Sequence, residues 1–180
     1  MNELSLHILD IINNSVKAGA SLVLLNVTED IKADLLTIII EDNGCGMDAD
    51  FLSKVLDPFK TTRTTRKVGL GLSLFKAAAE QTGGTLSVAS EKGVGTKVTA
   101  TFGYSHIDRQ PLGDVASTIT TVLSGNPNID ISYTHAFGEK LFTADSREIK
   151  KVLDGVDITT PEIIMWINDY INEGIKEIRS

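Results

Sequence analysis

Residues 35–47 read LLTIIIEDNGCGM, an unbroken apolar run that ends in a carboxylate, an amide and two glycines. A run of this length rich in β-branched residues is typical of a central strand. Asp42, at the end of that strand, can accept a hydrogen bond from an exocyclic amine, and the glycines let the backbone approach a flat base closely. An ordinary Asp-Asn-Gly turn explains the same residues equally well, so the rest of the chain must decide.

The sequence on either side of this strand alternates between helical and strand periodicity. Asp48 can cap a short helix, and spaced glycines after residue 68 open a segment of strong helix formers. The expected elements are a helix at 3–18, strands at 21–28 and 35–41, helices at 48–55 and 69–82, and strands at 85–90 and 96–104. This order predicts an α+β fold, a two-layer sandwich with a mixed sheet and helices on one face.

The character of the chain changes after Tyr104, where the polar stretch SHIDRQPLGD contains a proline and a glycine. We expect one domain at 1–106 and a small α/β module at 107–180. The module is predicted to contain helices at 112–124, 146–153 and 161–178 and strands at 129–137 and 140–144. Its last helix carries a stripe of isoleucines that we interpret as core, with a partner or dimer surface as the alternative. The stripe consists of Ile163, Ile164, Ile167, Ile171 and Ile175.

The composition is that of a soluble globular protein, with 42% apolar residues and a net charge of −7 from 17 basic and 24 acidic side chains. An acidic total argues against a general nucleic-acid coat and against electrostatic membrane docking, because both need a basic surface. The N-terminal residues lack the basic start of a secretory signal, and no apolar run reaches the roughly 18–20 residues of a membrane span. We therefore expect a cytoplasmic protein. Its single cysteine, Cys45, is expected to be a small buried hydrophobic residue.

Asp10, Asn14 and Lys17 occur at spacings of four and three in the first predicted helix, so they lie on one stripe of that helix. A carboxylate, an amide oxygen and an ammonium on one stripe suit a hydrated Mg²⁺ and the phosphates that it bridges. A solvent-exposed polar face is the plainer interpretation of these three residues taken alone.

Two further segments contain closely spaced glycines. Gly69 and Gly71 open a predicted helix directly after a stretch, residues 57–68, that is rich in lysine and arginine. Backbone N–H groups at a helix N-terminus bind phosphate, and glycine lets them converge on it. Residues 93–96, GVGT, lie between two predicted strands, where a simple hairpin turn explains them when they are taken alone.

Taken together and in this order, these segments resemble the GHKL superfamily, which includes histidine kinases, the gyrase-type topoisomerase ATPase, mismatch-repair ATPases and the heat-shock chaperone ATPase. The resemblance extends over residues 3–104. HILDIINNSVKAGA resembles the N box of that family, DNGCGM its first glycine box, DPFKTTR its lid, VGLGLSLFK its second glycine box and GVGTKV its last. It implies the Bergerat ATP-binding fold, with ATP and Mg²⁺ as cofactors.

The resemblance also implies roles for individual residues. Asn14 matches the asparagine that holds Mg²⁺ on the triphosphate, and Lys17 matches a lysine near the phosphates. Asp42 matches the aspartate that binds the adenine amine, and Thr96 matches a threonine near the adenine. The implied nucleotide-binding positions are Asn14, Lys17, Asp42, Gly44, Gly46, Met47, Arg63, Lys67, Gly69, Leu70, Gly71, Leu72 and Thr96, with Arg63 and Lys67 as candidates for the γ-phosphate.

One departure from the family pattern concerns catalysis. Mismatch-repair and topoisomerase members carry a glutamate four residues before the metal-binding asparagine, where it activates the attacking water. Asp10 occupies that position here and is one methylene shorter, so its reach changes and hydrolysis is expected to be slow. The lid and Lys17 resemble the histidine-kinase branch, whereas the AGA sequence after the N box resembles mismatch repair. We give more weight to the kinase-like branch.

The segment that carries the phosphoacceptor histidine of a sensor kinase is not found before the N box. His7 lies on the nucleotide helix and is expected to pack or to face solvent, while His106 and His135 lie outside the nucleotide-binding core. The expected function is transfer of the γ-phosphoryl group of ATP to a partner protein, as in anti-sigma-factor kinases. An ATP-hydrolysing switch that uses Asp10 and a non-catalytic nucleotide sensor are the alternatives. A homodimer is also left open.

Overall fold

The computed structural model describes residues 2–56 and 66–180, with the side chains of residues 66–70 excepted. Helices and strands follow one another in the order that the sequence predicts. The helices are α1 (Leu4–Lys17), α2 (Ala49–Val55), α3 (Arg66–Glu80), α4 (Val115–Gly125), α5 (Ser146–Leu153) and α6 (Pro161–Arg179). The strands are β1 (Leu22–Asp30), β2 (Leu35–Asp42), β3 (Thr85–Glu91), β4 (Gly95–Gly103), β5 (Asp130–Phe137) and β6 (Lys140–Asp145).

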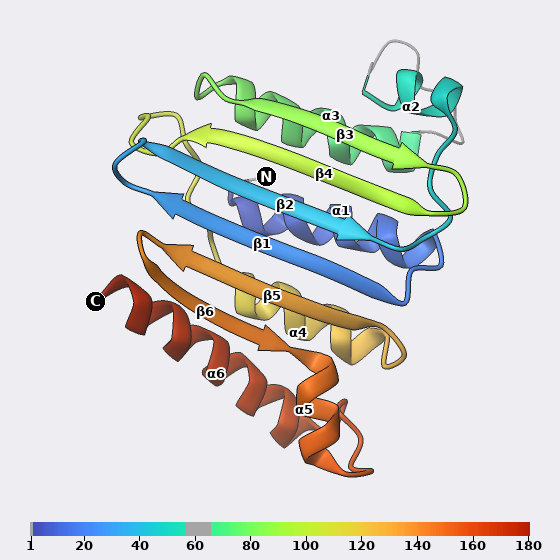
Figure 1. Cartoon of the computed structure of the whole chain (residues 1–180), viewed down its shortest axis with the longest axis vertical. Coiled ribbons are helices and arrows are strands. Elements are labelled where there is room, and N and C mark those ends of the chain that lie inside the picture. The colour runs from blue at the N-terminus through green and yellow to red at the C-terminus, as the bar shows by residue number, and fades with distance from the viewer. Residues whose placement is uncertain (1, 57–65) are drawn as a thin grey trace.

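The strands form one six-stranded sheet in the order β3-β4-β2-β1-β5-β6. β1 and β5 pair in parallel, and every other neighbouring pair is antiparallel, so the sheet is mixed. Helices α1, α3 and α4 cover one face of it (Figure 1). The predicted α+β class, with helices on one face of a mixed sheet, is therefore confirmed.

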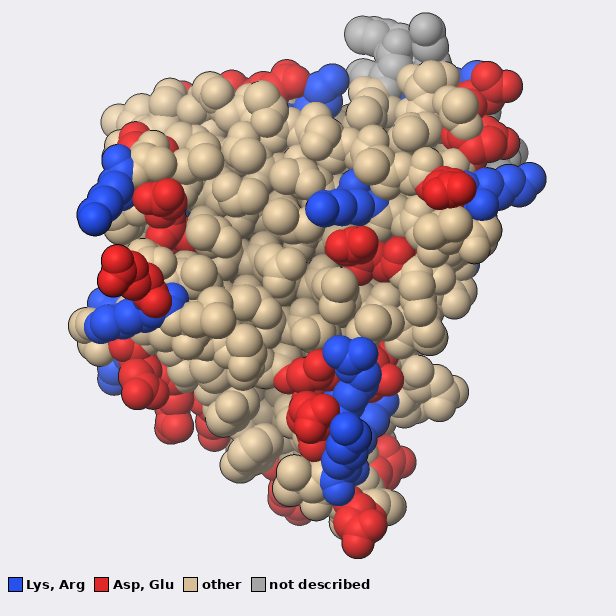
Figure 2. All heavy atoms as spheres, viewed as in Figure 1, with Lys and Arg blue, Asp and Glu red and all other residues tan. Residues whose placement is uncertain are grey.

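Strand β2 lies inside the sheet, as its apolar run predicts, but only one of its faces is fully buried. Leu36, Ile38 and Ile40 are at most 1% exposed, whereas Leu35 is 37% exposed. Among the described residues no helix covers the central strands on the opposite face (Figure 1), and Figure 2 shows few charged side chains there. β2 thus combines a position inside the sheet with the alternating burial of a one-sided sheet.

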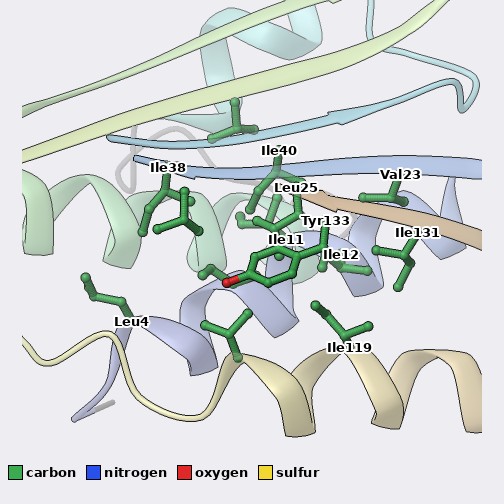
Figure 3. Packing of buried hydrophobic residues seen from close by; sticks show 14 of the residues in the cluster. Leu4, Ile11, Ile12, Val23, Leu25, Ile38, Ile40, Ile119, Ile131 and Tyr133 are labelled. Atoms are coloured by element: carbon green, nitrogen blue, oxygen red, sulfur yellow. The ribbon is translucent and has the colours of Figure 1, made fainter. Parts of the chain in front are cut away.

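Both parts of the chain contribute to one buried apolar cluster. Ile11 and Ile12 of α1 pack between Leu25 of the sheet and Ile119 of α4 (Figure 3). Backbone hydrogen bonds from Leu4 and Ser5 of α1 to the carbonyls of Pro111 and Leu112, at 2.9 and 2.8 Å, hold the connection before α4 against α1. Division into two domains near residue 106 stays a prediction, although the later strands continue the same sheet.

Helix α6 buries part of its isoleucine stripe, with Ile167 and Ile171 each 1% exposed. The core interpretation is therefore confirmed for these two residues. Within the described ranges, no helix has both the length and the apolar character that a bilayer crossing requires.

Candidate functional site

A cavity of about 400 Å³ opens between α1, the loop after β2, and β4. Residues more than 80 positions apart in the sequence meet there, because α1 packs against β2, and β2 pairs with β4. Seven of the predicted site residues line it: Asn14, Lys17, Asp42, Gly46, Met47, Leu72 and Thr96. The cavity therefore unites the N box with the first and last glycine boxes and with Leu72 in the second turn of α3.

Asp42 is held in a fixed orientation at the end of β2. The hydroxyl of Ser15 on α1 donates to its Oδ2 at 2.7 Å, and the backbone N–H of Gly44 donates to its Oδ1 at 2.9 Å. Each carboxylate oxygen keeps a free lone pair after these bonds, since an ionised carboxylate has about four acceptor positions. Asp42 is therefore a preoriented acceptor that faces the cavity.

The glycines after β2 permit close backbone packing. Gly46 has φ +70°, and a Cβ at this position would overlap the carbonyl of Glu91 in the β3–β4 hairpin. Gly44 is buried, and a Cβ there would lie 2.8 Å from Cβ of Ala18, the residue that follows α1. The loop that carries Asp42 is thus clamped between α1 and the hairpin, which explains why glycine is needed at both positions.

The prediction that Cys45 is buried is wrong. Its backbone makes the inward contacts, because its N–H donates to the carbonyl of Ala18 at 2.9 Å and its carbonyl accepts from the N–H of Gly93 at 2.6 Å. The side chain is left exposed at the mouth of the cavity.

Thr96 lies opposite this loop and is fixed by Ser90 on β3. The two hydroxyls are 2.8 Å apart, and Ser90 Oγ also accepts from the backbone N–H of Met47 at 2.8 Å. A hairpin joins β3 and β4 here, but its turn consists of residues 92–94, and Gly95 and Thr96 already belong to β4. Ser90 therefore ties the first and last glycine boxes together.

Asn14 and Lys17 line the cavity from α1, while Asp10 lies one turn earlier and does not. Asp10 contacts α3 instead: a Cβ on Gly71 would be 3.5 Å from Cβ and 3.7 Å from Oδ2 of Asp10. The predicted stripe is thus real, but its carboxylate lies between α1 and the second glycine box.

Helix α3 begins at Arg66, three residues before Gly69. Gly69 and Gly71 are therefore inside the helix, whereas the sequence predicted that they open it. Arg63 lies outside the described residues, as do the side chains of Lys67 and Leu70. Their predicted contacts with the phosphates stay predictions.

The residues around Asn14 suit a metal ion that arrives with its own ligands. No cluster of three or more His, Cys, Asp or Glu side chains that could form a metal cage occurs among the described residues. Mg²⁺ usually keeps several waters and binds through few protein oxygens plus substrate phosphates. One amide oxygen at the cavity wall fits that pattern.

Sequence reasoning missed several residues that build the site. Ser15 was visible only as a polar residue within the apolar stripe of the first helix, and Ser90 gave no local signal at all. Lys92 and Phe51 also line the cavity, from the β3–β4 hairpin and from α2. Lys92 adds a cation on the hairpin side of the cavity, where the sequence predicted none.

Comparison with protein families identifies residues 2–106 as matching the model described as histidine kinase-, DNA gyrase B-, and HSP90-like ATPase. Sensor kinase CckA of Brucella abortus is 44% identical over 66 residues, which cover 36% of this chain and 7% of that protein. The heme sensor protein HssS of Staphylococcus saprophyticus is 35% identical over 94 residues, which cover 52% of this chain and 20% of that protein. The chain thus spans at most a fifth of the length of these relatives.

Among solved structures, the Aquifex aeolicus MutL ATPase domain complexed with ADP superposes with a TM-score of 0.52 and 15% identity, over 81% of this chain and 63% of that one. At this identity the likeness concerns the fold alone. The family model matches more than half of the chain, including every segment that lines the cavity. The chain therefore belongs to the histidine kinase-, DNA gyrase B- and HSP90-like ATPase family.

Proposed function

We propose that this protein binds ATP with Mg²⁺ in the cavity between α1 and the loop after β2, and that it transfers the γ-phosphoryl group to a partner protein. The observation that carries the proposal is the meeting of Asp42, Asn14 and Thr96 in one cavity of about 400 Å³. This volume lies within the range of small-molecule sites, and the polar groups converge on an otherwise apolar lining.

Asp42 would bind the exocyclic amine of adenine. Its two oxygens are already oriented by Ser15 and Gly44, so little ordering of the side chain is needed when the base enters. Thr96, held by Ser90, would contact the same end of the base. Met47 and Leu72 supply apolar walls.

Asn14 would hold Mg²⁺ on the phosphates, and Lys17 would add positive charge beside them. The metal, when bound, neutralises the charge that develops on the phosphoryl oxygens. Lid residues Arg63 and Lys67 are proposed to contact the γ-phosphate. In the transfer, an acceptor side chain attacks the γ-phosphorus, the bond to the β–γ bridging oxygen breaks, and ADP leaves.

The histidines of the chain support an acceptor on another protein. His7 and His135 are 3% and 0% exposed, so neither reaches a phosphate. His7 stacks on Phe75 with ring centroids 5.4 Å apart, which confirms that it packs. His106 lies beside Gly103 at the far end of β4, and the seven residue steps from Thr96 to Gly103 span about 23 Å at the usual rise per residue.

A second candidate is an ATP-hydrolysing switch in which Asp10 activates water. Its position one helical turn before Asn14 and against Gly71 favours this possibility. In that mechanism the Asp10 carboxylate accepts a proton from the attacking water. A nucleotide sensor without turnover is the third candidate.

Calorimetric titration with ATP and ADP, with and without Mg²⁺, tests the shared part of these proposals. Asp42→Asn and Asn14→Ala should each weaken ATP binding by at least about tenfold, because each removes a charged or metal-linked contact worth about 1.5–3 kcal/mol. Asn13, an exposed asparagine of α1 that does not line the cavity, provides the matched control Asn13→Ala. Unchanged affinity in both site variants would refute the site assignment.

Phosphate release from the same samples separates the candidates. Asp10→Ala should abolish hydrolysis and leave ATP affinity unchanged if the protein is the proposed switch. Hydrolysis that survives Asp10→Ala would exclude that mechanism. Binding without turnover favours the kinase or the sensor, which transfer of label from [γ-³²P]ATP to a partner protein then distinguishes.

A further inference from the structure

A second apolar cavity, of about 540 Å³, lies between β6, α5 and α6. Figure 1 shows β6, α5 and α6 at the end of the sheet opposite α2 and α3, and none of the residues that line this cavity belongs to the proposed nucleotide site. We call it the α5–α6 groove. Its lining residues are Thr143, Ala144, Asp145, Glu148, Ile149, Val152, Leu153, Glu162, Ile163, Trp166 and Tyr170.

Large apolar side chains are exposed in and beside this groove. Val152 is 85% exposed, Met165 67%, Trp166 54% and Tyr170 39%. Trp166 and Tyr170 stack face to face, with ring centroids 5.2 Å apart and planes within 8°. Tyr170 in turn packs against Phe142 of β6, with ring centroids 5.3 Å apart, so the aromatic pair is held against the sheet. Exposed apolar residues gathered in this way mark interaction surfaces more often than scattered ones do.

The charged residues that line the groove are all acidic. Asp145 is paired with Arg147 at 2.7 Å and Glu148 with Lys151 at 3.2 Å. Glu162 has no ion pair with any residue that the structure describes. Figure 2 shows the mixture of cations and carboxylates over α5 at this end of the molecule.

The exposed side of α6 continues the same pattern. Asp169 and Glu173 are exposed on either side of Tyr170 and form no ion pair within the described part of the chain. Unpaired carboxylates thus alternate with Trp166 and Tyr170 along one side of the helix. Such a surface attracts a cation twice, through the carboxylates and through the faces of the aromatic rings.

We propose that the α5–α6 groove is the docking site for a segment of a partner protein that carries apolar side chains flanked by lysine or arginine. The apolar side chains would fill the groove against Trp166 and Val152, and the cations would pair with Glu162, Asp169 and Glu173. A second copy of this chain is a poorer occupant, because each copy carries a net charge of −7 and would bring the same carboxylates together. The inference goes beyond the proposed function and holds whether or not the chain transfers phosphate.

Selection from a random peptide library displayed on phage, with the full chain as bait, tests the proposal. The selected peptides should combine Leu, Ile, Met or Phe with Lys or Arg, and their affinity should fall as salt rises. Trp166 is the only tryptophan of the chain and reports occupancy directly. Its emission should shift to shorter wavelength when a selected peptide is titrated, because the indole leaves water.

Glu162→Lys and Asp169→Lys should each weaken peptide binding by at least about tenfold. Glu80→Lys makes the same charge change at an exposed residue of α3, outside the groove, and should change peptide affinity by less than about twofold. ATP titration of all three variants should match the wild type, so a failed nucleotide proposal and a failed docking proposal remain distinguishable. A normal far-UV spectrum shows that each variant is folded.

Any one of the following results would overturn the inference. They are a selection that enriches no peptide, enriched peptides that are acidic or uncharged, equal effects of Glu80→Lys and the two groove variants, and burial of Trp166 by self-association in sedimentation velocity. A shift of Trp166 emission to shorter wavelength with phosphatidylcholine vesicles, and none with the peptides, would overturn it as well.

Discussion

Gly46 illustrates how one backbone position supports the proposed nucleotide site. Its φ of +70° lies in the left-handed region, where a side chain is strained. In addition, a Cβ would overlap the carbonyl of Glu91. Gly83 has nearly the same conformation, with φ +77°, but nothing lies within 4 Å of a Cβ there. Comparing the two glycines therefore separates the free-energy cost of the left-handed conformation, which both share, from the cost of the overlap with Glu91, which only Gly46 has.

Gly46→Ala should destabilise the protein more than Gly83→Ala. The left-handed conformation alone costs about 1–2 kcal/mol for alanine, which we expect for Gly83→Ala. Gly46→Ala adds displacement of the β3–β4 hairpin, so a loss of at least about 3 kcal/mol in total is expected. Urea unfolding of both variants measures the difference. Equal losses would show that the loop adapts without moving the hairpin.

At the scale of elements, α6 is held against the sheet by a close contact at Gly174. This glycine is buried in the helix, and a Cβ would overlap the ring of Phe142 on β6. Phe142 has little freedom to move, since it also packs against Tyr133, with centroids 6.3 Å apart, and Tyr170. The short distance between α6 and β6 therefore depends on the absence of a side chain at residue 174.

Gly174→Ala should lower the free energy of unfolding although alanine is the better helix former. Helix propensity favours alanine by about 1 kcal/mol, but the overlap with Phe142 outweighs that gain. Gly125→Ala, at the end of α4 with open space around it, should be neutral or stabilising by up to about 1 kcal/mol. Thermal unfolding followed by circular dichroism compares the two. A stabilised Gly174→Ala would mean that α6 packs more loosely than the structure indicates.

At the scale of the whole molecule, a buried polar network around Glu29 joins β1, β5 and α6. Arg179 donates to both carboxylate oxygens of Glu29 at 3.0 Å, and His135 Nε2 lies 2.6 Å from Oε2. Tyr133 lies 2.5 Å from the other ring nitrogen of His135. Burial raises the pKa of Tyr133, so its hydroxyl keeps its proton and donates to Nδ1, while Nε2–H donates to Glu29. Tyr104, at the end of β4, donates to the same carboxylate at 3.1 Å.

The stability of the protein should depend on pH through Glu29. Burial alone raises the pKa of this carboxyl, but the hydrogen bonds from His135 and Arg179 outweigh it and lower the pKa from 4.5 to about 2. Because the folded pKa is below the unfolded one, the stabilisation is present above about pH 4.5 and is lost as pH falls toward 2. A difference of this size corresponds to about 3 kcal/mol.

Glu29→Gln should therefore be less stable than the wild type at neutral pH and should lose less stability between pH 5 and 2. Urea unfolding at several pH values measures the two curves. Glu80→Gln, which changes an exposed carboxylate, should follow the wild-type curve. Parallel curves for Glu29→Gln and the wild type would contradict the assignment of the acid transition to Glu29.

One shared cluster and one continuous sheet predict that the chain unfolds as a unit. Trp166 reports on α6 alone, whereas far-UV circular dichroism reports on all helices, and the two denaturation curves should coincide. ATP at about 100 times its dissociation constant should raise the free energy of unfolding measured at Trp166 by about 2.7 kcal/mol, although Trp166 lies outside the nucleotide site. Two separate transitions would instead support independent domains divided near residue 106.

The sequence alone determined the order of the elements, the fold class and seven of the 15 described residues that line the proposed nucleotide cavity. Helical spacing places Asn14 and Lys17 on one stripe of α1, the family resemblance points to the two glycines after Asp42, and Gly46 has the left-handed φ of +70° that few other residues adopt. These features are local, because they depend on neighbouring residues and on the short-range geometry of helices and turns. The wrong expectation for Cys45 marks the limit, since the exposure of a loop side chain depends on which neighbours occupy its other side.

Only the tertiary structure decided which distant residues touch. Parallel pairing of β5 with β1 brings His135 to Glu29, and the packing of α1 on β2 brings Ser15 to Asp42. The packing of α1 also keeps Asp10 out of the cavity. The packing of α6 against β6 leaves Trp166 exposed in the α5–α6 groove. Such contacts arise from burying apolar faces of elements that are far apart in the chain, so no local pattern encodes their register.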